Sequence, residues 1–563
     1  MKTKHILSIL ITLGTAVHMQ AQMPLWQGEG VPTVHITRVP CLEYENDADS
    51  ENENRNINRV SATQNAAPLK ALGSPMILVC LANYSDVPFS VAKDTESLKA
   101  LYNTFFNGKN QGVGDNPYSV YDYFNAMSNG LFTPEFIITD PITVPKKRHA
   151  YGSQSGSDAR RIYRNDALTQ LAPQIKERIS EYDTNGDNKI DGVIIVFPGC
   201  GAQVGDPDGI HPCCWPSSIS VSGVTYATSL VVPELLGMDL SEEGGDNNAK
   251  LNGIGVYVHE MSHMLGLPDF YDINYKGSGM DYWSLMDYGE YWNNGYTPTP
   301  YTAYERNFMG WMPLTELSDA TTIHDMKTIE QGGSAYVIYN EANRNEYYIL
   351  ENRTDADPWS RNLCSTLGNG LMIYHVDYDA SAWSNNRVNT NVNRQRMTII
   401  PANGHFEIAD NLMDDAAKYI SELRGHLWPL KNIESVLSYW GIAGNNALTD
   451  KEQTQGSRVA PAARLHTPNT DGSYFMHKPI TDIAYDADKK TISFNFMGGS
   501  STGIEDGMNP EDSFGDHDLR VFAMDGRMIA TLTENNLYTL PSGIYIVKDL
   551  VTGKTTKRIV GRQ

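Results

Sequence analysis

Basic residues are scarce in this chain. Its 563 residues include 44 lysines and arginines against 67 aspartates and glutamates, which gives a formal net charge of −23 at pH 7. An excess of negative charge of this size disfavours nucleic acid or an anionic membrane surface as a partner. It suits an extracellular protein that binds divalent cations.

Long apolar runs are also absent. After the N-terminus, no segment reaches the run of about 18 apolar residues that a transmembrane helix needs. Lys2 and Lys4 precede a short apolar run over residues 6–17, and the small Ala21 offers a cleavage point. This arrangement is typical of a signal peptide, so we predict a signal peptide over 1–21, secretion, and no membrane insertion. No cysteine lies near Ala21, which argues against a lipoprotein.

The most informative segment is HEMSHMLGLPD, which covers His259–Asp269. On a helix, His259 and His263 share one face, so both imidazoles can reach a single metal ion. Glu260 follows the first histidine, where its carboxylate can polarise a water bound to that metal. A helix is expected here because apolar residues recur at helical spacing on one face, namely Ile254, Val258, Met261 and Leu265.

The third metal ligand is expected just after this helix. Gly266 permits a sharp exit because glycine adopts a left-handed conformation without a steric penalty. That turn would bring Asp269 back towards the histidines, giving three protein ligands and one open position, as in catalytic zinc sites. One alternative stays open, in which a glutamate farther along the chain, Glu290 or Glu305, replaces Asp269.

Six stretches of the chain resemble the immune inhibitor A-like family of secreted zinc metallopeptidases, over roughly residues 74–495. They are SVYDYFNAMSNGLF, EYDTNGDNKIDGVIIVFPG, HEMSHMLGLPDFYD, MDYWSLMDYGEYWNNGYTPTPYTAYERNFMGW, EYYILENR and GLMIYHVDYDASAW. The longer pattern HExxHxxGxxH/D resembles that of the metzincin clan.

The resemblance implies roles for individual residues. His259, His263 and Asp269 would be the zinc ligands, with Glu260 as general base and acid. Met286, in the segment SLMDYG, is similar to the methionine turn beneath the metal. Tyr288, two positions later, is then the candidate for touching the metal or the oxyanion; a packed aromatic residue is the alternative.

A second candidate metal site lies upstream of the motif. Asp183, Asn185, Asp187 and Asp191 place side-chain oxygens at alternating positions, and the Lys189 carbonyl adds a further donor. Such alternation lets a loop wrap a calcium ion. The loop departs from the EF-hand pattern, because Asn and Ile occupy the positions of the usual glycine and bidentate glutamate. An Asx-rich turn without an ion therefore remains the alternative.

The six cysteines leave disulfide pairing open. Cys200 with Cys213 or Cys214 is the candidate local bridge, whereas Cys80 lies in an apolar run and is expected to be a buried small hydrophobe. Cys41 could act as a thiolate that caps the zinc and keeps the enzyme latent.

We predict an α/β (α+β) metzincin-like peptidase domain, a β-sandwich-like domain and a small C-terminal β-module. The expected strands of the second domain include Leu371–His375; His375 and nearby Asp377 are treated as structural because a histidine in a strand usually is.

The C-terminal pieces VFAMDGRMIATL, LPSGIYIVKD and KTTKRIVGRQ resemble sorting domains of type IX secretion substrates in Bacteroidetes-type bacteria. The implied partner is outer-membrane secretion machinery, with release or surface attachment. The predicted boundaries are 1–21 signal peptide, 22–73 propeptide or linker, 74–320 peptidase, 321–497 β-rich domain, 498–503 linker and 504–563 C-terminal module.

The sequence therefore predicts a secreted bacterial zinc endopeptidase, made as a zymogen, that hydrolyses proteins or peptides. Its cofactors would be Zn²⁺ and, at the second site, Ca²⁺. Arg55, Arg59 and Lys70 are candidate processing points. Two other functions stay open: an inactive surface binding or adhesion protein on a metallopeptidase scaffold, and a zinc amidase or deacetylase.

Overall fold

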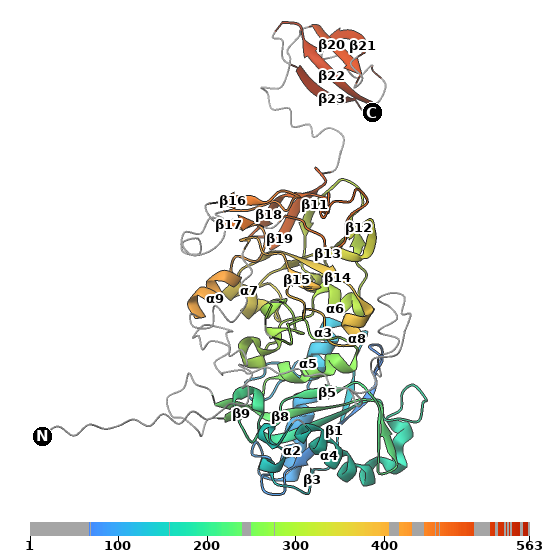
Figure 1. The fold of residues 1–563 in the computed structure, drawn as a ribbon, viewed down its shortest axis with the longest axis vertical. Helices are drawn as coiled ribbons and strands as arrows, with labels where there is room; N and C mark the ends of the chain where they lie inside the picture. Colours follow the sequence, from blue (N-terminus) through green and yellow to red (C-terminus); the bar gives the residue numbers. More distant parts are fainter. Residues whose placement is uncertain are drawn as a thin grey trace, which may run out of the picture. The chain divides into compact units, whose positions relative to one another are not determined.

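The computed structural model divides into two compact units, residues 1–319 with 323–497, and residues 498–563 with 320–322 (Figure 1). Within them it describes residues 67, 69–156, 158–238, 249–274, 276–277, 279–404, 416–430, 444–455, 458–460, 462–499, 518–523, 527–533, 536, 540, 543–551 and 555–560. The predicted signal peptide, Cys41, Arg55, Arg59 and most of the predicted propeptide and linker lie outside the described residues.

The first part of the large unit is a mixed α/β arrangement around a seven-stranded sheet. Its main path runs β2 (Glu135–Ile138), β1 (Met76–Asn83), β4 (Val193–Cys200), β8 (Ser229–Met238) and β5 (Cys213–Trp215). The first four are mutually parallel, and β5 pairs with β8 in antiparallel fashion. Two short strands complete it: β3 (Ile142–Thr143) beside β1 and β9 (Ala249–Leu251) beside β8.

Both faces of this sheet are covered, as its apolar strands require. Along β1, Ile77 and Val79 belong to one core, whereas Leu78 and Cys80 belong to the other. Helices α2 (Thr95–Asn107), α3 (Val120–Met127) and α5 (Ile254–Met264) pack in the first core; α4 (Ala159–Ile175) packs in the second. Helix α4 contains Pro173 and ends two residues after it, where the 3-10 turn η3 (Lys176–Glu181) begins.

The second part of the large unit contains a five-stranded sheet in the order β10 (Thr315–Glu316), β12 (Tyr336–Asn340), β13 (Asn343–Arg353), β14 (Gly370–Asp377) and β15 (Met397–Ile399). Tyr347 and Ile349 of β13 pack into the core that holds α5, while Tyr348 and Leu350 pack on the opposite side. That opposite core contains a three-stranded sheet of β11 (Thr321–Met326), β19 (Thr491–Phe496) and β18 (Ile480–Asp486). The β-rich part therefore shares a continuous apolar core with the helix of the HExxH motif.

The remaining elements of the large unit are short. They are β6 (Ile219–Val221), β7 (Val224–Tyr226), α6 (Ala303–Phe308), α7 (Arg361–Leu367), α8 (Ala380–Ser384), α9 (Ala416–Leu423), β16 (Gln453–Gln455), β17 (Arg458–Ala460), and the 3-10 turns η1 (Arg148–Tyr151), η2 (Ser153–Ser155), η4 (Ala202–Val204), η5 (Asp281–Trp283), η6 (Tyr288–Gly295) and η7 (Ile329–Gln331).

The smaller unit carries one four-stranded antiparallel sheet in the order β21 (Met528–Thr533), β20 (Asp518–Ala523), β22 (Gly543–Asp549) and β23 (Thr555–Val560). Its core is formed by Leu519, Val521, Tyr545 and Val547. These strands fall on the three C-terminal pieces singled out in the sequence.

All five described cysteines are free thiols, so the candidate bridge from Cys200 to Cys213 or Cys214 does not form. Cys80 is fully buried in β1, as predicted, and burial raises the pKa of its thiol to about 12. In the described part of the chain, helices of the length and apolarity needed to span a membrane are absent.

The segment that enters β1 is fastened to the end of α5. The amide of Leu69 donates to the carbonyl of Met264, and the indole Nε1 of Trp311 donates to the carbonyl of Ala71 at 2.6 Å. Leu69 and Ala71 are 1% and 2% exposed. Gly73 then pairs with Phe132 through a parallel bridge, which leads the chain into the sheet.

Candidate metal centre

Helix α5 is buried along its whole length, so its position is tightly fixed. The side-chain oxygen of Asn116 accepts a hydrogen bond from the amide of Ile254 and so satisfies one of the free donors at the helix start. Gly255 allows the backbone around Glu290 to approach, because a Cβ there would lie 1.8 Å from the Glu290 carbonyl oxygen.

Both histidines of the motif are held by main-chain carbonyls on the far side of their rings. His259 Nδ1 lies 2.9 Å from the carbonyl oxygen of Leu285, and His263 Nδ1 lies 2.6 Å from that of Leu267. A hydrogen bond from Nδ1–H to a carbonyl leaves the lone pair on Nε2, which is the usual arrangement of a metal-binding histidine. The two rings are nearly perpendicular, with centroids 4.9 Å apart.

Asp269 completes a cluster with these rings. Gly266 has a φ of +98°, as the predicted sharp exit requires, and the chain then turns back towards α5. The Oδ1 atom of Asp269 lies 3.3 Å from His259 Nε2 and 3.4 Å from His263 Nε2. The three potential ligand atoms all lie within 4.8 Å of one another, and all three residues are buried.

Asn386, which sequence reasoning missed, holds the aspartate. Its Oδ1 accepts the Asp269 amide at 2.7 Å, and its Nδ2 donates to Asp269 Oδ2 at 2.6 Å. Asn389 Nδ2 also donates to the carbonyl of Phe270, the next residue. Both asparagines follow β14, so the β-rich part of the chain fixes the position of the acidic member of the cluster.

The segment around Met286 supports the cluster from below. Met286 is fully buried, and its carbonyl accepts the amide of Phe270 at 2.8 Å. Its own amide donates to Ser284 Oγ, which in turn donates to Glu305 Oε1 at 2.7 Å. Together with the Leu285 carbonyl that fixes His259, this segment links the HExxH helix to the loop that carries Asp269.

The two rival glutamates occupy other positions. Glu290 Oε1 lies 3.8 Å from His259 Nδ1, the nitrogen that points away from the cluster. Glu305 forms the capping box of α6 with Thr302, and Ser284 donates to it as well. Neither carboxylate belongs to the group of ligand atoms that Asp269 forms with the histidines.

Glu260 and Tyr288 lie near the cluster in sequence but differ in environment. Glu260 is buried, burial raises its pKa well above the usual range, and within the described residues its Oε2 has no hydrogen-bond partner. Tyr288 is 8% exposed at the start of η6, where Asp287 accepts its amide and Tyr282 packs with its ring centroid 6.0 Å away.

The electrostatics of the cluster favour a cation. Burial alone would lower the pKa of His259, but Glu290 and Asp269 raise it to about 9. Burial would likewise raise the pKa of Asp269, yet the two imidazoles hold it well below its usual range. Two imidazole nitrogens and one carboxylate oxygen match the donor set of zinc, so these residues fit the predicted metal.

The predicted calcium loop brings Asp183, Asp187 and Asp191 together with ligand atoms within 4.8 Å. Backbone amides of the loop already bond to one of these carboxylates, since Asp183 accepts hydrogen bonds from the amides of Gly186, Asp187 and Asn188. The Asx-rich turn and the three converging carboxylates are therefore both present.

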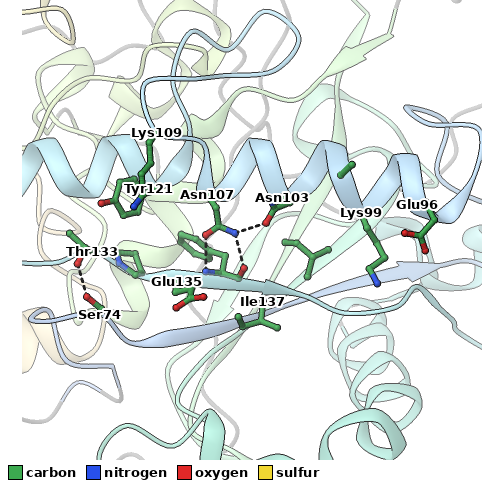
Figure 2. Close-up of a pocket in the computed structure, with 14 residues that line it drawn as sticks. Ser74, Glu96, Lys99, Asn103, Asn107, Lys109, Tyr121, Thr133, Glu135 and Ile137 are labelled. Atoms are coloured by element: carbon green, nitrogen blue, oxygen red, sulfur yellow. Dashed lines mark hydrogen bonds between the residues drawn. The ribbon is translucent and has the colours of Figure 1, made fainter.

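An open groove of about 830 Å³ lies elsewhere, between α2 and the edge strand β2 (Figure 2). The side chain of Asn107 spans it and pairs with both backbone groups of Phe136, at 2.7 and 2.9 Å. The residues of the HExxH cluster are not part of its lining.

Two histidines one helical turn apart, an aspartate that closes on them, and a buried glutamate next to the first histidine define a site of the metallopeptidase class. The family follows from sequence comparison. Residues 77–312 match the family described as immune inhibitor A peptidase M6, catalytic domain.

Two relatives show how far the similarity extends. Immune inhibitor A of Bacillus thuringiensis subsp. alesti is 27% identical over 274 residues, which is 41% of this chain and 39% of that protein. The pre-pro-metalloprotease PrtV of Vibrio cholerae serotype O1 (strain M66-2) is 25% identical over 274 residues, or 41% of this chain and 29% of PrtV. The aligned region thus spans well under half the length of either relative.

Proposed function

We propose that this protein is a secreted zinc endopeptidase with a metzincin-type catalytic domain, and that His259, His263 and Asp269 are its zinc ligands. The observation that carries the proposal is the convergence of their three ligand atoms within 4.8 Å, with both Nδ1 atoms turned onto main-chain carbonyls. The peptidase M6 match over 77–312 supports the same conclusion.

Zinc bound there supplies Lewis-acid activation of water and of the scissile carbonyl group. Glu260 takes the proton of the attacking water and passes it to the leaving amine, because its carboxylate is buried beside a ligand and its Oε2 has no hydrogen-bond partner among the described residues. The hydroxyl of Tyr288 donates to the oxyanion. Met286 acts through packing and through its backbone hydrogen bonds with Phe270 and Ser284.

Further parts of the proposal concern the rest of the chain. Residues 22–73 include a prosegment, an idea supported by the name of the relative PrtV, a pre-pro-metalloprotease. The loop with Asp183, Asn185, Asp187, the Lys189 carbonyl and Asp191 binds calcium and stiffens the catalytic part. The C-terminal unit directs export through an outer membrane.

Matched glutamate variants test the catalytic proposal. We expect Glu260→Gln to keep zinc, measured by elemental analysis, and to lose casein hydrolysis by about 10²–10⁴-fold. Asp269→Ala should lose zinc as well, because it removes a ligand. Glu290→Gln is the control, since Glu290 faces the wrong side of His259, and it should keep its zinc. Full activity of Glu260→Gln, or normal zinc in Asp269→Ala, would refute the assigned roles.

The two other functions make different predictions in the same assay. A zinc amidase or deacetylase would hydrolyse small amides and leave casein intact. A binding protein on a metallopeptidase scaffold would turn over neither substrate, even when loaded with zinc. Glu260, which only the chemistry requires, lies beside the ligands and argues against the binding protein. The comparison of casein with small amides separates the endopeptidase from the amidase or deacetylase.

A further inference from the structure

A second cluster of ligand-type side chains lies in the β-rich part of the chain. Glu346 on β13 and His375 on β14 are diagonal neighbours in the antiparallel pair, since Glu346 lies opposite Asp377. His466 approaches them from a later loop. His375 Nε2 lies 2.9 Å from Glu346 Oε1, and the ring centroids of the two histidines are 4.8 Å apart. One ligand atom from each of the three residues lies within 4.8 Å of the others.

This geometry parallels that of the HExxH cluster. In both places two imidazoles and one carboxylate converge, and the histidine rings lie almost the same distance apart. In both places the carboxylate is fully buried, with Glu346 and Asp269 at 0% and 1% exposed.

The ring of His466 is oriented in a way that serves metal binding. His466 Nδ1 lies 3.2 Å from Asp377 Oδ2, and in the described residues the Nε2 of His466 has no hydrogen bond. A carboxylate on one ring nitrogen fixes the ring and presents the other nitrogen to an ion. Asp377 is itself held at 2.7 Å by Arg394 and at 3.0 Å by Arg396, so its position does not depend on the histidine.

The local charge also suits a cation. The carboxylates of Glu346, Asp377 and Asp379 outnumber the guanidinium groups of Arg394 and Arg396, which pair with the last two.

We propose that Glu346, His375 and His466 form a second, structural zinc-type site, separate from the catalytic centre. Two imidazoles and one carboxylate favour zinc over calcium or magnesium, which prefer oxygen ligands alone. His466 is 25% exposed at its side chain, so a water molecule can reach the fourth position. The ion would join β13, β14 and the loop of His466, and β14 continues into the segment that carries Asn386.

The test counts zinc ions per chain. Untagged full-length protein is equilibrated with zinc chloride in calcium-containing buffer, desalted and analysed for metal. We expect two zinc ions per chain in the wild type, one in His466→Ala, one in His259→Ala and none in the double variant. His477→Ala is the matched control, because both ring nitrogens of His477 already face carboxylates, Asp450 and Asp471. It should keep two.

A melting experiment covers the case in which a variant folds poorly. In His259→Ala, where the catalytic site is disabled, added zinc should still raise the melting temperature by mass action, and the additional change His466→Ala should abolish that rise. One zinc ion in the wild type together with none in His259→Ala would overturn the second site. Two zinc ions in His466→Ala would overturn it equally. Neither result bears on whether the HExxH centre hydrolyses peptides.

Discussion

Removing the side chain of Asn386 should weaken metal binding without touching a ligand. Asn386 is 4% exposed and makes two hydrogen bonds with Asp269, one to its backbone amide and one to its carboxylate oxygen Oδ2. The other oxygen, Oδ1, is the atom that faces the two histidines. Without Asn386, the carboxylate is free to rotate and to swing away from them.

The size of the effect follows from these bonds. A hydrogen bond to a charged group contributes about 1.5–3 kcal/mol, which corresponds to roughly a 10- to 100-fold loss of zinc affinity. Loss of a residue that orients a metal ligand typically has an effect of about the same size. Asn386 has a φ of +53°, so Asn386→Gly is the better variant, because glycine tolerates this conformation and alanine would add strain.

The assay is a zinc competition titration with a chelator, followed by peptide hydrolysis at saturating zinc. Asn386→Gly should release zinc at about 10- to 100-fold lower chelator concentration, and excess zinc should restore part of the activity. Asn385→Gly is the control: this neighbour is exposed, and within the described structure its side chain bonds only to Ser381. Equal zinc affinity in the wild type and Asn386→Gly would refute the reasoning.

Three further predictions follow from other parts of the chain. Calcium should raise the melting temperature of the zinc-loaded protein through mass action, and Asp187→Ala should abolish that rise; identical melting with and without calcium would exclude the site. Burial, reinforced by Glu330, raises the pKa of Asp357 to about 6. The folded state therefore favours the protonated carboxyl group. The stability that this group contributes is full below about pH 4 and is lost as the pH rises through 6. Asp357→Asn should therefore increase the free energy of unfolding at pH 8, by up to roughly 3 kcal/mol, and change it little at pH 4. Denaturant titrations at both pH values measure this free energy, and an equal effect of the substitution at pH 4 and pH 8 would contradict the prediction. A chain truncated after Gly503 should hydrolyse casein when purified but accumulate inside the cell, whereas an inactive truncated enzyme would place the C-terminal unit in the catalytic core.

The elements that the sequence predicts well are those with a strong local pattern. The continuous apolar run of β1, the helix of the HExxH motif and the glycine turn at Gly266 each depend on residues close together in the chain. Strand β8 has no such pattern, because it contains Pro233, which cannot donate to the sheet, and a charged Glu234. The structure accommodates that buried carboxylate through the amides of Ser90, Val91 and Gly199.

The part of the candidate site that lies close together in the chain is predictable for the same reason, and the part that distant segments contribute is not. His259, His263 and Asp269 lie within one turn and one loop of each other, so spacing alone suggests their convergence. Asn386 lies 117 positions from Asp269 and has no motif of its own. His375 appears structural in isolation, because its relation to His466 depends on how a later loop folds back onto β14.

The short stretch between Leu69 and Gly73 limits where this chain can be cut. Lys70 has an exposed side chain, but both of its neighbours are buried and bonded, one to the end of α5 and the other to Trp311. A protease needs several residues in extended, accessible form, and that stretch cannot supply them without separating from the end of α5. If the proposed prosegment is removed while the fold stays intact, we therefore expect the cut upstream of Leu69, so that Leu69–Gly73 stays packed beside α5.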